Sequence, residues 1–253
     1  MMHTNVVQMA PTKTDLPPLS NLPYHVGIIM DGNGRWARRQ GKSRHEGHKA
    51  GTENLRRIIT ASVEFGVKML TIYAFSTENW QRPALEVQGL MMLLERVLDR
   101  ELNELHQNGV QLRHLGDPSP LNPRIQKKIT GAIELTKDND QLILNIAFNY
   151  GGRYEIIQAI KAIIRDQISE EQINEALLCR YLYTAAVPDP DLIIRTSGEF
   201  RTSNFLLWQA AYAEYYVTPT YWPDFDKAEY WRALCEYSRR DRRYGQAKGA
   251  DSR

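Results

Sequence analysis

The sequence is poor in cysteine and has no long apolar run near its N-terminus. Its two cysteines, Cys179 and Cys235, belong to no CxxC pair and have no histidine at metal-ligand spacing. We therefore expect two packed free thiols rather than a disulfide framework or a zinc site. The stretch through Pro23 is rich in Thr, Pro and Asn and lacks the apolar run of a signal peptide or a membrane span. We predict a disordered lead-in over residues 1–23 and a cytoplasmic protein.

An excess of charge of one sign is also missing. The formal net charge is +2, and so weak an overall field gives no reason to expect nucleic acid as a partner. The sequence contains no GxGxxG dinucleotide fingerprint, no GxSxG elbow and no Ser-His-Asp order of catalytic residues. Redox chemistry on a dinucleotide and acyl hydrolysis are therefore poor candidates.

What the sequence does contain is a regular alternation of strand-like and helical segments. Strands are predicted over residues 26–30, 67–75, 110–115, 142–149, 191–195 and 214–217. Helices are predicted after Gly34, over 47–65, between Pro83 and Gly109, and over 123–137, 154–167, 170–182, 205–213 and 226–243. A chain of 253 residues can form one sizeable core. The pattern predicts a single α/β domain with an open, mostly parallel sheet of about six strands and helices on both faces.

The first predicted strand ends at an acid, Asp31, and the turn after it has the composition of an anion site. Gly32 and Gly34 leave backbone N–H groups uncovered, and three arginines follow in the next helix. Such groups bind phosphate, and an acid beside them suggests a shared divalent cation. A type I′ hairpin turn at Asn33-Gly34 is the alternative, but the sequence after it lacks the two-residue alternation of a strand.

Three later strands also end in polar residues. The carboxyl ends of parallel strands meet at one edge of a sheet, where ligands bind. We therefore expect a cluster that adds to Asp31 the residues Ser76, Glu78, Asn79, Asn149, Arg153, Arg195, Ser197, Glu199, Arg201 and Ser203. This set of donors suits two phosphate-bearing groups and a metal ion.

Five ordered blocks of the sequence resemble the signature blocks of the cis-prenyltransferases, with the bacterial enzymes as the nearest pattern. They are IMDGNGRWA at 29–37, GHKAG at 47–51, YAFSTENWQRP at 73–83, NIAFNYGGR at 145–153, and DLIIRTSGE at 191–199 with RTSNFLLWQ at 201–209. The resemblance implies a catalytic domain over residues 24–245 and leaves a polar tail at 246–253.

The resemblance also implies an activity. An allylic starter such as farnesyl diphosphate would be extended by repeated condensation with isopentenyl diphosphate, with Mg²⁺ as cofactor and a cis double bond in each new unit. The expected product is a C55 polyprenyl diphosphate, the lipid carrier for wall glycans, which a homodimer would deliver to the inner membrane surface.

Site residues follow from the matching blocks. Asp31 would coordinate Mg²⁺ and help the allylic diphosphate to depart, and Glu214 would complete the metal site from a partner-facing segment. The allylic diphosphate would lie against Gly32, Asn33, Gly34 and Arg35, with Arg44 and His48 nearby and Trp36 at the border. The isopentenyl diphosphate would be held by Arg195, Arg201, Thr202 and Ser203. A C-terminal Arg-x-Gly, at 243–245 here, is associated with a phosphate contact across the dimer.

A mobile substrate-contacting loop is implied at Ser76, Thr77, Glu78, Trp80 and Arg82. Within it Asn79 is assigned as the proton acceptor. A neutral amide is a very poor base, so we expect Asn79 to orient the substrate or to relay a proton to a diphosphate oxygen. Phe200 departs from relatives that have a polar or imidazole side chain there, so a binding role of that side chain is not carried over, whereas the backbone could still bind.

Rival functions remain open at this point. The haloacid-dehalogenase phosphatases also place Asp after an apolar strand, but they need a second Asp two residues later, where this chain has Asn33. A non-catalytic partner subunit of a prenyltransferase is another alternative, although Asp31 and the block after it are intact. The arginines are not interleaved with stacking aromatics as in an RNA-binding protein. Prenyltransferases with two DDxxD motifs are excluded because the sequence has none.

The long helix before Gly109 carries an apolar stripe from Leu90 to Leu105. Ordinary core packing explains such a stripe. A second explanation is the wall of a tunnel for an apolar product chain, shared with Met91, Met92, Ile143 and Ile146.

Overall fold

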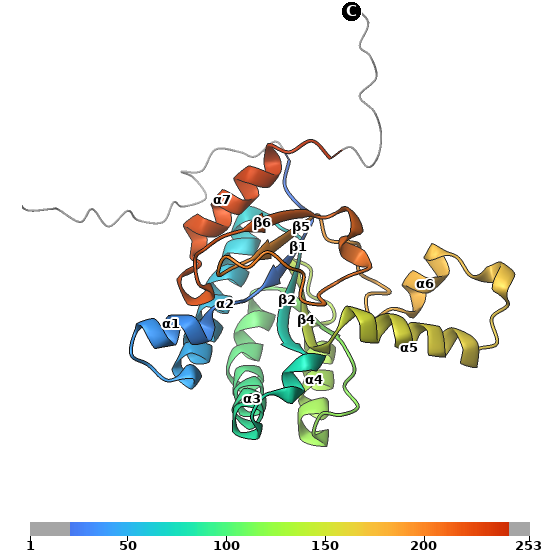
Figure 1. The fold of residues 1–253 in the computed structure, drawn as a ribbon, viewed down its shortest axis with the longest axis horizontal. Coiled ribbons are helices and arrows are strands. Elements are labelled where there is room, and N and C mark those ends of the chain that lie inside the picture. The colour runs from blue at the N-terminus through green and yellow to red at the C-terminus, as the bar shows by residue number, and fades with distance from the viewer. Residues whose placement is uncertain (1–20, 243–253) are drawn as a thin grey trace, which may run out of the picture.

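Six strands form one open sheet in the computed structural model, which describes residues 21–242 (Figure 1). The strands are β1 (His25–Ile29), β2 (Met69–Ser76), β3 (Val110–Leu115), β4 (Leu142–Tyr150), β5 (Leu192–Arg195) and β6 (Glu214–Val217). The helices are α1 (Asn33–Arg39), α2 (Arg44–Phe65), α3 (Ala84–Gln107), α4 (Pro123–Thr136), α5 (Gly152–Arg165), α6 (Glu175–Tyr181) and α7 (Lys227–Ser238). The predicted α/β alternation is confirmed.

The sheet has the order β3-β4-β2-β1-β5-β6, and every pair of neighbours is parallel. At the carboxyl end of the central strand β1, Ile29 pairs with Tyr73 of β2 on one side and with Arg195 of β5 on the other. The polar segments that follow these strands therefore start from one edge of the sheet, as the strand predictions required.

The two faces of the sheet are covered differently. Ile28 and Leu70 point into the largest core cluster, to which α2, α3, α4 and α7 contribute apolar side chains. On the opposite face, Ile29 packs against Phe205 and Leu206 of the segment between β5 and β6. Helices α5 and α6 extend to one side of the sheet (Figure 1). Within residues 21–242 no helix combines the length and the apolarity that crossing a bilayer requires.

Two of the predicted helices are shorter than expected. The segment 170–182 is divided into a 3₁₀ turn (Glu170–Gln172) and α6. Asn174 separates them, because its Oδ1 accepts a hydrogen bond from the Leu177 amide at 2.9 Å and an N-cap residue has a non-helical backbone. At the other end of the chain, α7 begins after the N-cap residue Asp226 and stops at Ser238.

The helix predicted over residues 205–213 is absent, and this prediction was wrong. Only the 3₁₀ turn Gln209–Tyr212 is helical there, and Asn204 and Leu206 have positive φ angles of 66° and 46°. Phe205, Leu206 and Ala210 of the segment are buried against the sheet. A buried apolar loop has the composition of a short helix, so periodicity alone does not separate the two.

Candidate active site

Asp31 lies just beyond β1, and Thr196 holds its backbone from the end of β5. The Thr196 hydroxyl donates to the Asp31 carbonyl oxygen at 2.7 Å and accepts from the Asp31 amide at 2.9 Å. The Trp222 amide donates to the same carbonyl oxygen at 3.0 Å. These bonds fix the position from which the Asp31 side chain extends.

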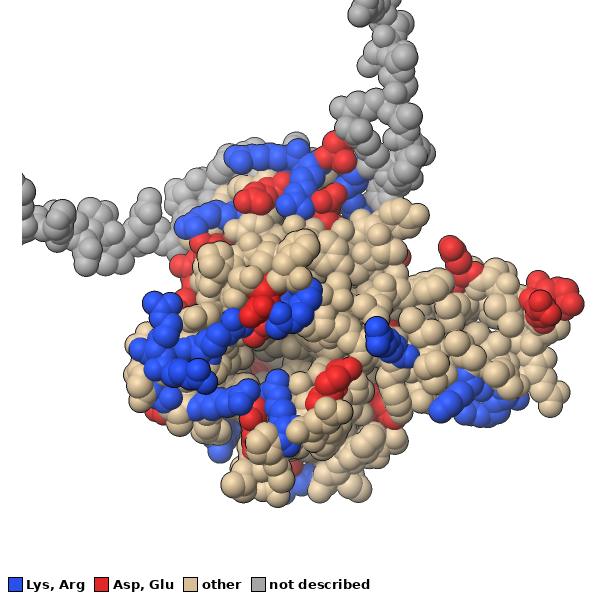
Figure 2. Space-filling view, in the orientation of Figure 1, with Lys and Arg blue, Asp and Glu red and all other residues tan. Residues whose placement is uncertain are grey.

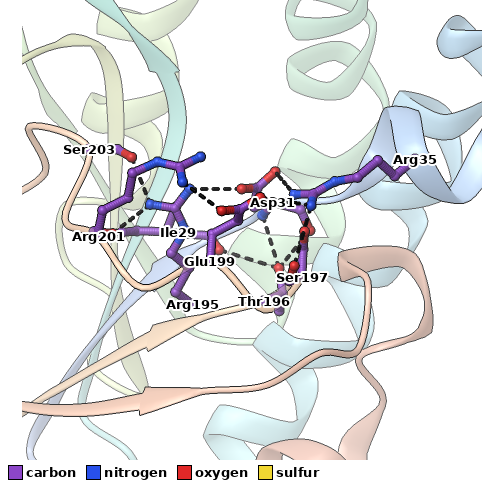
Figure 3. A network of polar contacts seen from close by, with 9 residues as sticks. All are labelled: Ile29, Asp31, Arg35, Arg195, Thr196, Ser197, Glu199, Arg201 and Ser203. Carbon is purple, nitrogen blue, oxygen red and sulfur yellow. Dashed lines mark hydrogen bonds and ion pairs between the residues drawn. The ribbon is translucent and has the colours of Figure 1, made fainter.

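Two arginines flank the Asp31 carboxylate (Figure 3). Arg195 Nη2 donates to Asp31 Oδ2 at 2.8 Å, and Arg35 Nη2 lies 3.2 Å from Asp31 Oδ1. Burial raises the pKa of this carboxyl, but the hydrogen bond and charge of Arg195, with the charge of Arg35, outweigh that effect and leave the pKa below its usual value. Asp31 is therefore an anion at neutral pH.

Arg195 connects Asp31 to the loop after β5. Arg195 is only 4% exposed, and its Nη1 donates to Ser203 Oγ at 2.7 Å and to the Arg201 carbonyl oxygen. Its Nε is buried and has no hydrogen-bond partner among the described residues. Thr202 lines a small pocket together with Arg195 and Arg201. The four residues predicted to hold the second diphosphate are thus brought together.

Glu199 joins the two groups of arginines. It accepts hydrogen bonds from Arg35 Nη1 at 2.9 Å and from Arg201 Nη1 at 2.6 Å. Hydrogen bonding to Arg201 is the main cause of the lowered pKa of the Glu199 carboxyl, and Arg35 adds to it. The carboxylates of Asp31 and Glu199 therefore lie among these arginines at positions that anionic groups of a substrate could take.

A polar pocket of about 410 Å³ opens beside Asp31. Its lining comprises Met30, Asp31, Gly32, Asn33, Gly34, Arg35, Arg38, Lys42, Arg44, His48 and Arg82. Cationic side chains surround a hollow near the middle of the face in Figure 2. The structure thereby brings Arg44 of α2 and Arg82 to the turn after β1, and it adds Lys42, which no motif had indicated. Five cations around one carboxylate make a site for a polyanion such as a diphosphate.

Glycines allow the backbone to crowd around this pocket. Gly32 has a φ of 105°, and a Cβ there would lie 2.8 Å from the ring of Tyr221. A Cβ at Gly47 would lie 2.3 Å from the Asn33 carbonyl oxygen, and one at Gly51 equally close to Asn33 Oδ1. The GHKAG block is thus explained by the close approach of α2 to the turn after β1.

Trp36 lies on α1 and is not part of the pocket lining, although its neighbour Lys42 is. Its indole Nε1 donates to Asp224 Oδ1 at 2.8 Å, and the Lys42 ammonium lies 4.8 Å from the centre of its ring. These contacts hold the Trp36 ring and position the Lys42 charge next to the pocket.

His48 and Asn33 lie where the polar pocket meets an apolar cavity of about 130 Å³. The cavity is lined by Met30, Asn33, His48, Gly51, Thr52, Leu55, Ile72, Ala74, Phe75, Leu90, Leu93, Leu94, Val97, Ile146, Phe148 and Trp222. Burial, and then the charges of Arg82 and Arg44, lower the pKa of His48 to about 4, so its imidazole is neutral. His48 Nε2 and Asn33 Oδ1 are buried without a partner in the described part of the chain, which is typical of groups that face a ligand or water.

The apolar stripe of α3 divides between the cavity and the core. Leu93 and Val97 line the cavity, whereas Leu98 packs in the main core cluster. Met92 is 60% exposed and points away from both. Ile146 lines the cavity as the tunnel hypothesis expected, but Ile143 is not part of its lining.

The predicted substrate loop is a 3₁₀ turn (Thr77–Gln81) that directly follows Ser76 at the end of β2. Asn79 Oδ1 accepts a hydrogen bond from the Ser76 amide at 3.1 Å, so in this state the Asn79 side chain stabilises the turn. Arg82 and Arg44 both form ion pairs with Glu86 of α3 at 3.0 Å. These pairs connect the loop to the polar pocket.

Two asparagines hold this loop: Asn149, which the expected cluster of strand-end residues included, and Asn204, which it did not. Trp80 Nε1 donates to Asn149 Oδ1 at 2.7 Å, and Asn204 Nδ2 donates to Glu78 Oε1 at 2.6 Å. Both asparagines have positive φ angles, 51° and 66°. Their presence in the NIAFNYGGR and RTSNFLLWQ blocks indicated a special role, but their contacts could be identified only from the three-dimensional structure.

Glu214 lies at the opposite end of the sheet from Asp31. It begins β6, whereas Val217 at the other end of that strand pairs with Arg195. Three residues of strand correspond to roughly 10 Å. The Glu214 carboxylate accepts a hydrogen bond from Arg240 Nη1 at 2.8 Å. A metal site containing both acids would therefore have to form between two copies of the chain.

Because Glu214 lies far from it, Asp31 is the candidate metal ligand that a single chain provides. The structure has, over residues 21–242, no group of three or more His, Cys, Asp or Glu side chains that could hold a metal ion. Mg²⁺ is commonly bound through one or two carboxylates together with substrate phosphates and water. A single anionic carboxylate beside an anion pocket fits that mode. The Arg-x-Gly at 243–245 lies outside the described residues.

Comparisons with known proteins find chains that are similar to this one over most of its length. A family model described as putative undecaprenyl diphosphate synthase matches residues 29–245. An isoprenyl transferase of Heliobacterium mobile is 52% identical over 231 residues, which cover 90% of this chain and 89% of the relative. A ditrans,polycis-undecaprenyl-diphosphate synthase, (2E,6E)-farnesyl-diphosphate specific, of Legionella pneumophila is 46% identical over 89% of this chain and 96% of its own. The crystal structure of lavandulyl diphosphate synthase from Lavandula x intermedia, in complex with dimethylallyl diphosphate, superposes with a TM-score of 0.85 and 38% identity over 89% of this chain and 99% of its own.

Proposed function

Because the chain belongs to the prenyltransferase family of undecaprenyl diphosphate synthases, we propose that it condenses isopentenyl diphosphate repeatedly onto farnesyl diphosphate. Each new unit carries a cis double bond, and the product is the C55 polyprenyl diphosphate that carries peptidoglycan and other wall glycans. The farnesyl-diphosphate specificity in the name of the Legionella relative supports the choice of starter.

The observation that carries the proposal is the pair of anion sites on either side of Asp31. On one side, Arg35 and the pocket after β1 offer backbone amides and cations. On the other, Arg195 offers a buried guanidinium and Ser203 a half-buried hydroxyl. Two diphosphates bound on these two sides would have Asp31 between them, as a condensation of two diphosphate esters needs.

The allylic diphosphate binds in the pocket after β1. Gly32, Asn33 and Gly34 present backbone to it, and Arg35 and Arg44 neutralise its charge. When bound through Asp31, Mg²⁺ would neutralise the charge that develops on the leaving diphosphate. Positioned N–H donors stabilise the same charge, and each such donor lowers a barrier by about 3 kcal/mol.

The isopentenyl diphosphate binds at Arg195, Arg201, Thr202 and Ser203. There its double bond attacks the allylic carbon as the carbon–oxygen bond to the first diphosphate breaks. A proton then leaves the new unit, and a diphosphate oxygen accepts it. Asn79 and its loop orient the reacting chain and exclude water, because a neutral amide cannot serve as the base.

The growing chain occupies the apolar cavity under α3. That cavity begins at His48 and Asn33, next to the proposed allylic diphosphate. Burial of an apolar chain there avoids its exposure to water, which favours elongation into the cavity.

A second copy of the chain completes the functional unit. Ile157, Ile160 and Ile164 are exposed on one face of α5, and soluble monomers rarely expose a contiguous apolar row. We assign this face to a homodimer in the cytoplasm, which delivers its product to the inner membrane surface.

The proposal is tested by incubating the protein with farnesyl diphosphate and labelled isopentenyl diphosphate, with Mg²⁺ or with EDTA. Label is expected in long-chain products only when both substrates and Mg²⁺ are present. Release of phosphate from farnesyl diphosphate alone would instead indicate a phosphatase. No turnover of any allylic starter would indicate a non-catalytic subunit.

A further inference from the structure

A second cavity, of about 260 Å³, lies between α2 and α3 outside the diphosphate sites. Thr52, Leu93 and Val97 line both this cavity and the apolar one beneath it. The two spaces therefore meet at one ring of side chains. The apolar cavity thus has a polar pocket at one end, beside Asp31, and a second mouth between the two helices.

The rim of this second mouth is cationic. It includes Lys49 and Arg56 of α2 and Arg96 and Arg100 of α3, against the two carboxylates of Glu53 and Glu101. Arg56 and Arg100 both form ion pairs with Glu101. Lys49 and Arg96 form no ion pair with any residue in the described range 21–242, so their charges are available to an outside partner.

Exposed apolar side chains continue this rim along α3. Leu85 and Met92 are 83% and 60% exposed. They precede Arg96 by 11 and 4 positions, which places all three on one face of the helix. Large apolar side chains next to cations on one helix face are typical of a surface that rests in a lipid interface.

We infer that the mouth between α2 and α3 docks on a bilayer rich in anionic phospholipid and is where the long product chain leaves the protein. The inference rests on the proposed function for the identity of the cargo. The docking itself rests on the unpaired charges, the apolar residues beside them and the connection to the apolar cavity. Lys49 and Arg96 attract the lipid headgroups, and Leu85 and Met92 enter the interface.

Docking is measured without substrates, by sedimentation of the full-length protein with vesicles of phosphatidylcholine alone or mixed with phosphatidylglycerol. Binding is expected only to the mixed vesicles and should weaken as salt rises, because exposed charges are screened. The double variant Lys49→Glu/Arg96→Glu should bind the mixed vesicles about tenfold or more weakly. Met92→Ser should weaken binding while keeping its salt dependence.

The matched control is Lys68→Glu/Lys127→Glu, which makes the same change of charge at two exposed lysines away from the mouth. It should bind as the wild type does. Equal losses in the two double variants, or equal binding to both kinds of vesicle, would overturn the inference. A wild type that elongates prenyl chains but ignores the mixed vesicles refutes only the docking. One that binds them but makes no product refutes the proposed function instead.

Discussion

Arg195 Nη2 and Asp31 Oδ2 lie 2.8 Å apart at the ends of the neighbouring strands β5 and β1. The guanidinium is almost fully buried and also donates to Ser203. Asp31 is therefore the counterion of Arg195 in the structure. The contact couples the proposed metal ligand to the proposed isopentenyl diphosphate site.

Replacing Arg195 by lysine tests this coupling. A lysine ammonium lacks the planar fork that reaches Asp31 and Ser203 together. We expect kcat/KM for isopentenyl diphosphate to fall about 100-fold, the usual loss for one positioned donor. Steady-state kinetics with the concentration of each substrate varied in turn provides the measurement. An unchanged kcat/KM, in a variant with normal thermal unfolding, would refute the role.

Gly32→Ala tests the backbone of the anion pocket. The positive φ and the close contact with Tyr221 should lower the free energy of unfolding by about 1–3 kcal/mol. The control is Gly131→Ala in α4, where a Cβ meets nothing within 4 Å. The higher helix propensity of alanine should raise the free energy of unfolding there by at most about 1 kcal/mol. Urea denaturation measures both changes. A stable Gly32→Ala protein would mean that the turn adopts another conformation in solution.

Leu93→Trp tests the path of the product chain. Leu93 lines the apolar cavity, whereas Leu98 lines a smaller cavity that shares Leu94 with it. Leu93→Trp should therefore shorten the products strongly, and Leu98→Trp should shorten them less. Leu135→Trp, at an exposed position of α4, should leave the length distribution unchanged. Reversed-phase chromatography measures the product lengths. Unchanged lengths in Leu93→Trp would exclude this path for the product chain.

His25 gives a prediction for the pH dependence of stability. Burial lowers its pKa to about 4, from about 6.5 in the unfolded chain, and outweighs the hydrogen bond to the Pro188 carbonyl oxygen, which raises the pKa. The unfolded state binds the proton first, so the native protein loses stability as the pH falls below about 6.5. At pH 5.5 the loss from this residue is about 1.4 kcal/mol relative to pH 7.5.

His25→Asn should remove that loss. The variant's loss of unfolding free energy relative to the wild type should be smaller at pH 5.5 than at pH 7.5 by about 1.4 kcal/mol. Urea unfolding at both pH values measures this difference. The control is His45→Asn at an exposed histidine, which gives the effect of replacing a histidine by asparagine outside the buried site. An equal loss of unfolding free energy in His25→Asn at both pH values would mean that His25 binds a proton as readily in the native state as in the unfolded chain.

The strands and their polar ends were predictable because local properties determine them. An apolar run such as residues 26–30 must be buried, and polar residues with glycine after it must form a turn. The parallel arrangement then brought Asp31, Ser76 and Arg195 to one edge. The expectation of a mostly parallel sheet was confirmed, and the sheet is parallel throughout.

Contacts between segments far apart in the chain were not predictable in this way. The bonds of Asn149 to Trp80 and of Asn204 to Glu78 depend on strand order and on positive φ angles, which no single segment specifies. The position of Glu214 likewise depends on which end of β6 faces Asp31. The sequence pattern predicted the strand but gave no distance between the two acids.

The most direct test of the account is the product ladder from labelled isopentenyl diphosphate, farnesyl diphosphate and Mg²⁺, with wild type and Asp31→Ala compared side by side. The wild type should give a ladder ending near C55. The variant should show almost no incorporation, although it folds normally by circular dichroism. A variant that elongates as fast as the wild type would contradict the assignment of Asp31 and, with it, the proposed organisation of the site.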